Sequence, residues 1–341
     1  MTQIKLSQPT NASRVSVFAA SRKFDWVIAL FSLWFVSGLH LDEWAHHHEQ
    51  VETFFTLWHG VLYSGFVVTA LALVIGVWRN RAQSTSWQAA IPTGYSLSLV
   101  GAALFMFGGM ADGVWHTLLG IEVDVEALLS PPHLLLAFGG ALIVTGPLRA
   151  AWVRNENTPT LAQLLPAILS ATLLLSLMAF FTQYASVLAL AANLQRAIPG
   201  DLGEAIRSQG IAGVLVQTAV LMGLMLALAR RWRMPFGSWT MLLTLHVLLV
   251  VAPHENWNLI PIGLVVGLLA DVLMHTTGAS RLFAVITPIA FFVALFATLA
   301  LSGGFSWGVP FWSGALVLAG TVGWLMHWLS SLATIQASNA P

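Results

Sequence analysis

Two short stretches of the chain carry the same arrangement of carboxylate and imidazole side chains. In each stretch an Asp and a His lie four residues apart, and a second His follows after a short loop of twelve or sixteen residues. Residues four apart share one face of a helix, so the Asp and the first His can reach one ligand. Each stretch therefore predicts a hairpin of two helices that presents three side chains to one point. The residues are Asp42, His46 and His59 in the first stretch, and Asp112, His116 and His133 in the second.

The types of these side chains point to a metal site. The chain has no cysteine, so a metal ion must be bound through nitrogen and oxygen. Imidazole combined with carboxylate suits copper(II), zinc or non-haem iron, and geometry decides among them. Neighbouring polar residues are candidates for orienting the imidazoles, although a hydrated loop without a ligand is the alternative interpretation. They are His47, His48, Glu49, Glu52, Glu122, Glu126, His254 and Glu255.

The elements that position these residues are predicted to be membrane-spanning helices. Hydrophobic residues make up 57% of the chain and charged residues only 8%, against roughly a quarter charged in soluble proteins. Long continuous apolar runs fit helices across a hydrocarbon core of roughly 30 Å and do not fit the short alternating strands of a β-barrel. We expect an all-α, polytopic transmembrane bundle of about ten spanning helices. The expected spans are 25–45, 53–78, 89–116, 130–153, 161–194, 209–231, 238–253, 257–276, 282–302 and 311–334.

The basic residues predict the orientation of the bundle. Most Lys and Arg residues fall in alternate connections, which by the positive-inside rule face the cytoplasm. Both termini are then cytoplasmic, and the histidine-rich loops lie on the extracytoplasmic side of a membrane, expected to be the bacterial inner (plasma) membrane. The exceptions, Arg196 and Arg207, are expected in a loop with Asp201 and Glu204. The 14 basic residues match 14 acidic ones, which argues against nucleic-acid binding.

The chain divides into four parts by this pattern. Residues 1–24 form a polar cytoplasmic segment before an uncleaved first helix, and 25–155 form the two predicted metal-binding hairpins. Residues 156–334 form the remaining helices, and 335–341 form the C-terminal tail. Asp271 and His275 repeat the four-residue spacing, but the predicted topology puts them on the cytoplasmic side, so they are excluded from the site.

At the two motifs the sequence resembles the C subunit of the particulate methane and ammonia monooxygenases, which are copper-dependent membrane oxygenases. The stretch DGVWHTLLGIEVDVEALLSPPH is similar to a family motif that supplies Asp, His and His to one copper site, here Asp112, His116 and His133. The stretch DEWAH with the later His59 resembles a second motif that supplies Asn, His and His. In this chain Asp42 stands in place of the Asn, the two motifs occur in reversed order, and the loop before His133 is longer.

The resemblance implies a copper-binding membrane protein that is an O₂-dependent monooxygenase, or a subunit of one, acting on a small apolar substrate. It also implies other membrane subunits in an oligomer around it. The residues leave other functions open: a zinc hydrolase with a carboxylate base such as Glu49 or Glu122, a copper-binding or copper-relay protein, or a non-catalytic membrane subunit. A haem carrier using His40, His59 or His246, and a transporter using His246 and Gln217, are further alternatives.

Overall fold

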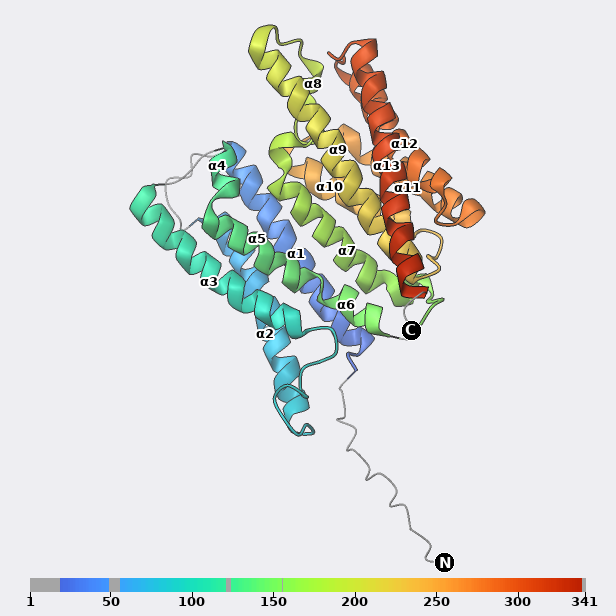
Figure 1. The fold of residues 1–341 in the computed structure, drawn as a ribbon. Helices are drawn as coiled ribbons and strands as arrows, with labels where there is room; N and C mark the ends of the chain where they lie inside the picture. Colours follow the sequence, from blue (N-terminus) through green and yellow to red (C-terminus); the bar gives the residue numbers. More distant parts are fainter. Residues whose placement is uncertain (1–18, 49–55, 121–123, 155, 339–341) are drawn as a thin grey trace, which may run out of the picture.

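The computed structural model describes residues 19–48, 56–120, 124–154 and 156–338, and within these ranges the protein consists of helices without strands (Figure 1). The all-α prediction is confirmed. Within these described ranges, eight helices are long and apolar enough to cross a membrane. They are α1 (Arg22–His48), α2 (Leu57–Arg81), α3 (Ser96–Leu119), α7 (Leu161–Phe181), α9 (Gly200–Arg231), α11 (Ile260–Thr277) with the 3-10 turn η3 (Trp257–Leu259) before it, α12 (Arg281–Ser302) and α13 (Val309–Ser338).

In the described residues, eight helices, or nine with one bent pair, meet the length and hydropathy of a membrane span, and a shorter apolar helix lies where the tenth was expected. Helices α5 (Pro131–Val144) and α6 (Gly146–Val153) are bent by 40° relative to each other and together form a ninth candidate span. Helix α10 (Ser238–Val251) has 14 residues, or about 21 Å at 1.5 Å per residue, which is short of the hydrocarbon core. Several of its apolar residues are buried by protein: Trp239, Leu242, Leu243 and Val247 are fully enclosed, whereas Met241 and Leu248 are exposed. An apolar sequence does not reveal whether lipid or protein surrounds it.

Two other boundaries differ from the expectation. The apolar run 161–194 does not form one helix, because α7 ends at Phe181 and is followed by the 3-10 turn η1 (Gln183–Ala185) and the short α8 (Ala191–Gln195). Helix α9 begins at Gly200, so Asp201, Glu204 and Arg207 lie in its first turns and not in a loop. The remaining short elements are α4 (Asp124–Leu129) and the 3-10 turn η2 (Ala252–His254).

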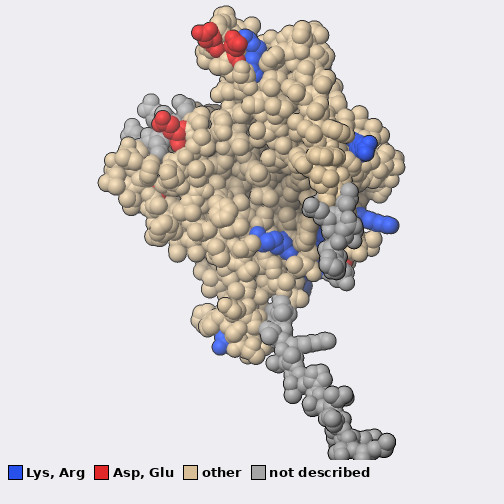
Figure 2. Space-filling model, viewed as in Figure 1, with Lys and Arg blue, Asp and Glu red and all other residues tan. Residues whose placement is uncertain are grey.

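The two ends of the bundle differ in their polar residues. Helix α1 begins and α13 ends at the lower end in Figure 1, and the acidic groups visible in Figure 2 gather at the upper end, around α4 and the α8–α9 region. At the lower end Asp25 is buried, accepts a hydrogen bond from Tyr95 Oη at 2.7 Å and forms an ion pair with Arg154. The candidate ligands on α1 start at Asp42, about 30 Å along the helix from Arg22 at 1.5 Å per residue.

Close helix packing holds each predicted hairpin together. A Cβ atom at Gly38 of α1 would lie 2.7 Å from the Cα atom of Leu62 on α2, and one at Gly108 of α3 would lie 3.1 Å from the side chain of Leu136 on α5. Small residues let membrane helices approach this closely. Each glycine is four residues before the Asp of its motif, and each leucine is three residues after the second His. The contact therefore sets the depth at which the candidate ligands of the two helices meet.

Candidate metal centres

The first predicted group is assembled as expected. Asp42 Oδ2 lies 3.7 Å from His46 Nε2 and 3.5 Å from His59 Nε2. Donors held about 2.1 Å from a tetrahedral metal ion are separated by about 3.4 Å, so one ion can reach all three atoms after small side-chain adjustments. Thr56, the N-cap of α2, lies 2.9 Å from His59 Nδ1 through its hydroxyl oxygen. That contact directs Nε2 of His59 toward Asp42.

The second group has the same construction on α3 and α5. Asp112 Oδ1 lies 3.4 Å from His116 Nε2 and 3.5 Å from His133 Nδ1. His116 Nδ1 lies 3.3 Å from the carbonyl oxygen of Gly120, to which it can donate. Ser130, the N-cap of α5, lies 2.8 Å from His133 Nδ1, so its hydroxyl must turn if this nitrogen binds an ion. The Asp112 side chain is only 4% exposed.

A third group was not expected from the sequence. Glu43, His47 and His254 also place one ligand atom each within 4.8 Å of one another. Glu43 was not singled out, and His47 and His254 were expected only to orient other imidazoles. The signal that would have found the pair on α1 is Glu43-x-x-x-His47, which repeats the Asp42-x-x-x-His46 spacing one residue later. That one-residue shift turns the second pair about 100° around the helix, toward a different neighbour.

All three groups face one cavity of about 1300 Å³. Asp42, Asp112 and Glu43 line it together with five of the six histidines of these groups. Its other walls are apolar and come from five helices. They include Phe35 and Leu39 of α1, Leu62 of α2, Phe105 of α3, Leu136 of α5 and Leu177 of α7. The arrangement joins charged ligand atoms to an apolar space among the helices.

The remaining residues predicted to orient the imidazoles lie outside the three groups or outside the described residues. His48 Nε2 lies 3.6 Å from Glu255 Oε1, and the Trp44 indole donates to the same oxygen at 3.2 Å. This places Glu255 beside the end of α1 and outside the three groups. Glu126 is exposed on α4 and belongs to none of the groups. Glu49, Glu52 and Glu122 lie outside the described residues.

The excluded Asp271 has a structural contact. Its carboxylate accepts hydrogen bonds from the backbone N–H groups of Trp239 and Thr240 at 3.2 and 3.0 Å, and from the Thr240 hydroxyl at 2.6 Å. It therefore caps the N-terminus of α10. The same four-residue spacing that forms a ligand pair in α3 forms a helix cap here.

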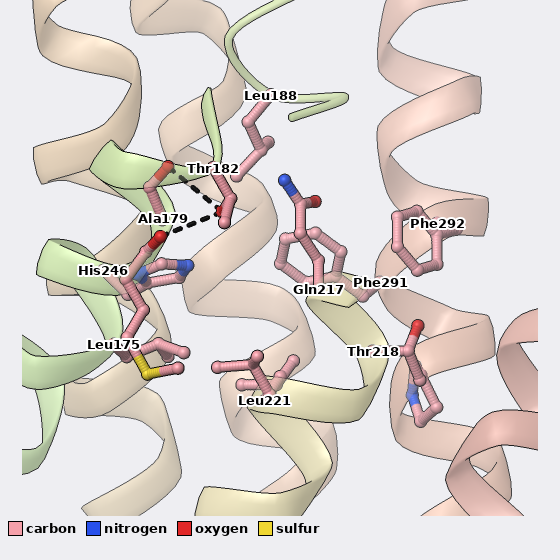
Figure 3. A pocket seen from close by; sticks show the side chains of 13 residues that line it. Leu175, Ala179, Thr182, Leu188, Gln217, Thr218, Leu221, His246, Phe291 and Phe292 are labelled. Carbon is pink, nitrogen blue, oxygen red and sulfur yellow. Dashed lines mark hydrogen bonds between the residues drawn. The ribbon is translucent and has the colours of Figure 1, made fainter. Parts of the chain in front are cut away.

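A smaller cavity in the second half of the chain contains His246. Figure 3 shows the His246 imidazole beside Gln217, with Phe291, Phe292 and Leu221 among the apolar walls. The cavity has a volume of about 90 Å³. His246 Nδ1 is buried and makes no hydrogen bond with a described residue. No second carboxylate or imidazole lines this cavity in the described part of the chain, so it lacks the donors of a metal group.

The structure extends the sequence repeat beyond the predicted ligands. Both hairpins follow the pattern Gly-x-x-x-Asp-x-x-x-His, then Ser or Thr-x-x-His-x-x-Leu. The glycine and leucine form the contact between the helices, and the hydroxyl of the N-cap residue contacts Nδ1 of the histidine. No protein-family model, curated protein or solved structure matches the chain. The argument about function therefore depends on the geometry of these groups.

Proposed function

We propose that this chain is an integral membrane protein that binds copper at two centres and uses them in the O₂-dependent oxidation of a small apolar substrate, alone or as a subunit of a larger enzyme. The observation that carries the proposal is the duplicated Asp-His-His group, with donor separations of 3.4–3.7 Å in both copies. A hydrated loop without a ligand does not require two hairpins with the same hydroxyl–histidine contacts and the same glycine contacts.

The donor set supports copper over other metals. Divalent copper binds nitrogen and oxygen ligands more tightly than the other first-row metals, including zinc and iron. Three protein ligands leave coordination positions for water or a reactant. Bound copper would supply one-electron redox chemistry and the activation of oxygen. Asp42, His46 and His59 would hold one ion, and Asp112, His116 and His133 the other.

The residues of the cavity support the apolar substrate. Phe35, Phe105, Leu136 and Leu177 form a wall that excludes water next to the ligand atoms, and an apolar molecule dissolved in the bilayer gains free energy by contact with such a wall. The chain supplies no reductant, so the two electrons and two protons that convert one oxygen atom of O₂ to water must come from a partner. This agrees with the resemblance to the C subunit of the copper membrane monooxygenases, which implies further subunits.

The charge distribution supports an extracytoplasmic position for the two centres. Arg22 and Lys23 begin α1, and Arg79 and Arg81 end α2, at the ends of these helices that are remote from the ligands. By the positive-inside rule these ends face the cytoplasm. The proposed copper ions would then lie on the outer side of the bacterial inner membrane, where copper enters from the periplasm.

Metal analysis of the purified full-length protein in lipid nanodiscs tests the proposal. We expect at least two copper ions per chain, a copper(II) signal in electron paramagnetic resonance, and loss of about one ion in His59→Ala and in His133→Ala. His275→Ala is the matched control, because His275 shares the four-residue spacing with Asp271 but belongs to none of the groups; it should leave the copper content unchanged.

Oxygenase activity is tested separately, by measuring O₂ consumption and product formation. With an added reductant and a short alkane or alkene, the copper-loaded protein, or its complex with its partner subunits, should consume O₂ and form the alcohol or epoxide. Copper at both centres without product would leave a copper-binding or copper-relay function and reject the oxygenase. Stoichiometric zinc without copper would reject both and favour a hydrolase.

A further inference from the structure

Glu43, His47 and His254 form a cluster that is separate from the two proposed copper groups. Glu43 Oε1 lies 3.8 Å from His254 Nε2, and the ring centroids of His47 and His254 are 5.1 Å apart. The Glu43 and His254 side chains are only 7% and 13% exposed. The cluster joins α1 to the 3-10 turn η2, and so connects the part of the chain with the hairpins to the second half.

Each donor in this cluster is oriented by a contact behind it. His47 Nδ1 lies 2.9 Å from the carbonyl oxygen of Glu43 and donates to it, which leaves Nε2 with its lone pair available. Glu43 Oε2 lies 3.2 Å from His40 Nδ1, and His40 Nε2 lies 2.8 Å from Ser176 Oγ. If Ser176 donates to Nε2, then Nδ1 carries the proton and donates to Glu43. Such contacts behind a ligand fix its tautomer and orientation.

The turn that carries His254 has an uncommon backbone conformation. Glu255 has φ 56° and is the only residue other than glycine with a positive φ in the described ranges. A Glu in the left-handed region is uncommon, and sparsely populated conformations cluster at functional sites. Contacts from Trp44 and His48 hold the Glu255 side chain against α1. The next residue back, His254, thereby faces Glu43.

We propose that Glu43, His47 and His254 bind a third metal ion, of the divalent N- and O-liganded class, which joins α1 to the α10–η2 turn. The position is independent of the repeat, since it uses one ligand from outside both hairpins. It shares the cavity of the two copper groups, so an ion here lies on the same side of the bundle. The ion would give the second half of the chain a role in the metal-binding site.

The test isolates this position in the full-length protein in nanodiscs. His59→Ala and His133→Ala are combined so that each repeat group keeps only two of its three donors, and the protein is loaded with copper(II), then in parallel with zinc, and washed with a weak chelator. We expect one ion per chain in this double variant. Adding His254→Ala should reduce the content to below one tenth of an ion. Adding Glu43→Gln, which keeps the size of the side chain, should do the same.

The matched control is His275→Ala in the same double variant. His275 lies in the last turn of α11 and belongs to none of the groups, so the one ion should remain. Circular dichroism and gel filtration of each variant distinguish loss of a ligand from loss of the fold; if His254→Ala does not fold, Glu43→Gln and His47→Gln provide the result. A double variant that binds no ion, or an ion retained in both Glu43→Gln and His254→Ala, overturns the third centre. The parent protein's copper content tests the first two centres separately.

Discussion

Replacing Asp112 with Asn tests whether the carboxylate is a metal ligand or the partner in a structural ion pair. The Asp112 carboxylate is almost fully buried and lies 3.4 and 3.5 Å from two imidazoles. Substitution of a residue that merely orients a ligand lowers metal affinity 10–100-fold, so we expect the loss of this ligand's charge to lower affinity at least 100-fold. At free metal 1,000 times the parent's Kd, bound metal stabilises the parent by about 4.1 kcal/mol and the variant by about 1.4 kcal/mol.

In the metal-free protein we do not expect Asp112→Asn to lower the stability. No Lys or Arg is among the described residues that line its cavity, so burial of the carboxylate charge is unfavourable until a metal ion binds. Asp112→Asn should then leave the metal-free protein as stable as the parent or more stable. Breaking a buried structural ion pair would instead cost about 3–5 kcal/mol. Thermal unfolding in nanodiscs, with chelator and with saturating copper, measures both values.

Asp271→Asn is the matched control for this experiment. Asp271 has the same spacing to a histidine as Asp112, but its carboxylate accepts three hydrogen bonds from Trp239 and Thr240 at the start of α10. Hydrogen bonds to a charged group contribute about 1.5–3 kcal/mol each, so this variant should lose stability equally with and without metal. If Asp112→Asn behaves like Asp271→Asn, with a destabilised metal-free state and an unchanged metal-induced shift, the metal-binding argument for α3 is wrong.

Four further results are expected. Thr56→Ala should lower copper affinity about 10-fold or more through His59, whose Nδ1 contacts the Thr56 hydroxyl, in addition to a cap loss of about 1 kcal/mol, whereas Ser280→Ala, at the N-cap of α12, should show only the cap loss in thermal unfolding. Gly38→Ala should lower the melting temperature and the copper content because its Cβ would meet backbone at 2.7 Å, while Gly60→Ala, with nothing within 4 Å, should change neither. His246→Leu should keep the full copper content and raise the melting temperature by a few degrees, since it removes a buried nitrogen without a partner; a lower melting temperature would contradict this. Copper affinity should fall as the pH is lowered, because protons compete with the ion for the two imidazoles of each group; an affinity that stays constant over the whole pH range in which the protein is folded would contradict imidazole ligation.

The two hairpins could be predicted from the sequence because the residues that meet in each of them are close together in the chain. The four-residue spacing in one helix and a short return loop determine which residues meet, and the structure assembles both Asp-His-His groups from these rules. The same rule did not distinguish Asp271 from Asp112. That difference depends on what packs against each helix: the N-terminus of α10 against Asp271, and the start of α5 against Asp112.

The features that the sequence did not predict depend on contacts between distant segments. Glu43 meets His254, 211 residues later in the chain, only because the η2 turn packs against the end of α1. The surroundings of helix α10 are another such feature. The helix is as apolar as a membrane span but shorter, and it has both fully enclosed residues and the exposed Met241 and Leu248, a division that hydropathy alone does not show.

The buried carboxylates of this protein fall into two classes with different partners. At the lower end of the bundle Asp25 is paired with Arg154 and Tyr95, and Asp271 accepts hydrogen bonds at a helix N-terminus. Both negative charges therefore have a cation or several donors, as buried charges require. These contacts account for Asp25 and Asp271 without a ligand.

The three remaining buried carboxylates of the described residues lie together and face imidazoles. Asp42, Glu43 and Asp112 all line the large cavity, and no Lys or Arg is among its described lining residues. Imidazole binds a metal ion in its neutral form. Three negative charges in one partly enclosed cavity repel one another and lose hydration. Both effects lower the free energy of unfolding of the metal-free protein. Bound cations remove these effects at all three positions at once. A single cause thus accounts for the two repeated groups and for the third, and it predicts that the metal-free protein gains more stability from divalent cations than from an equal ionic strength of sodium chloride.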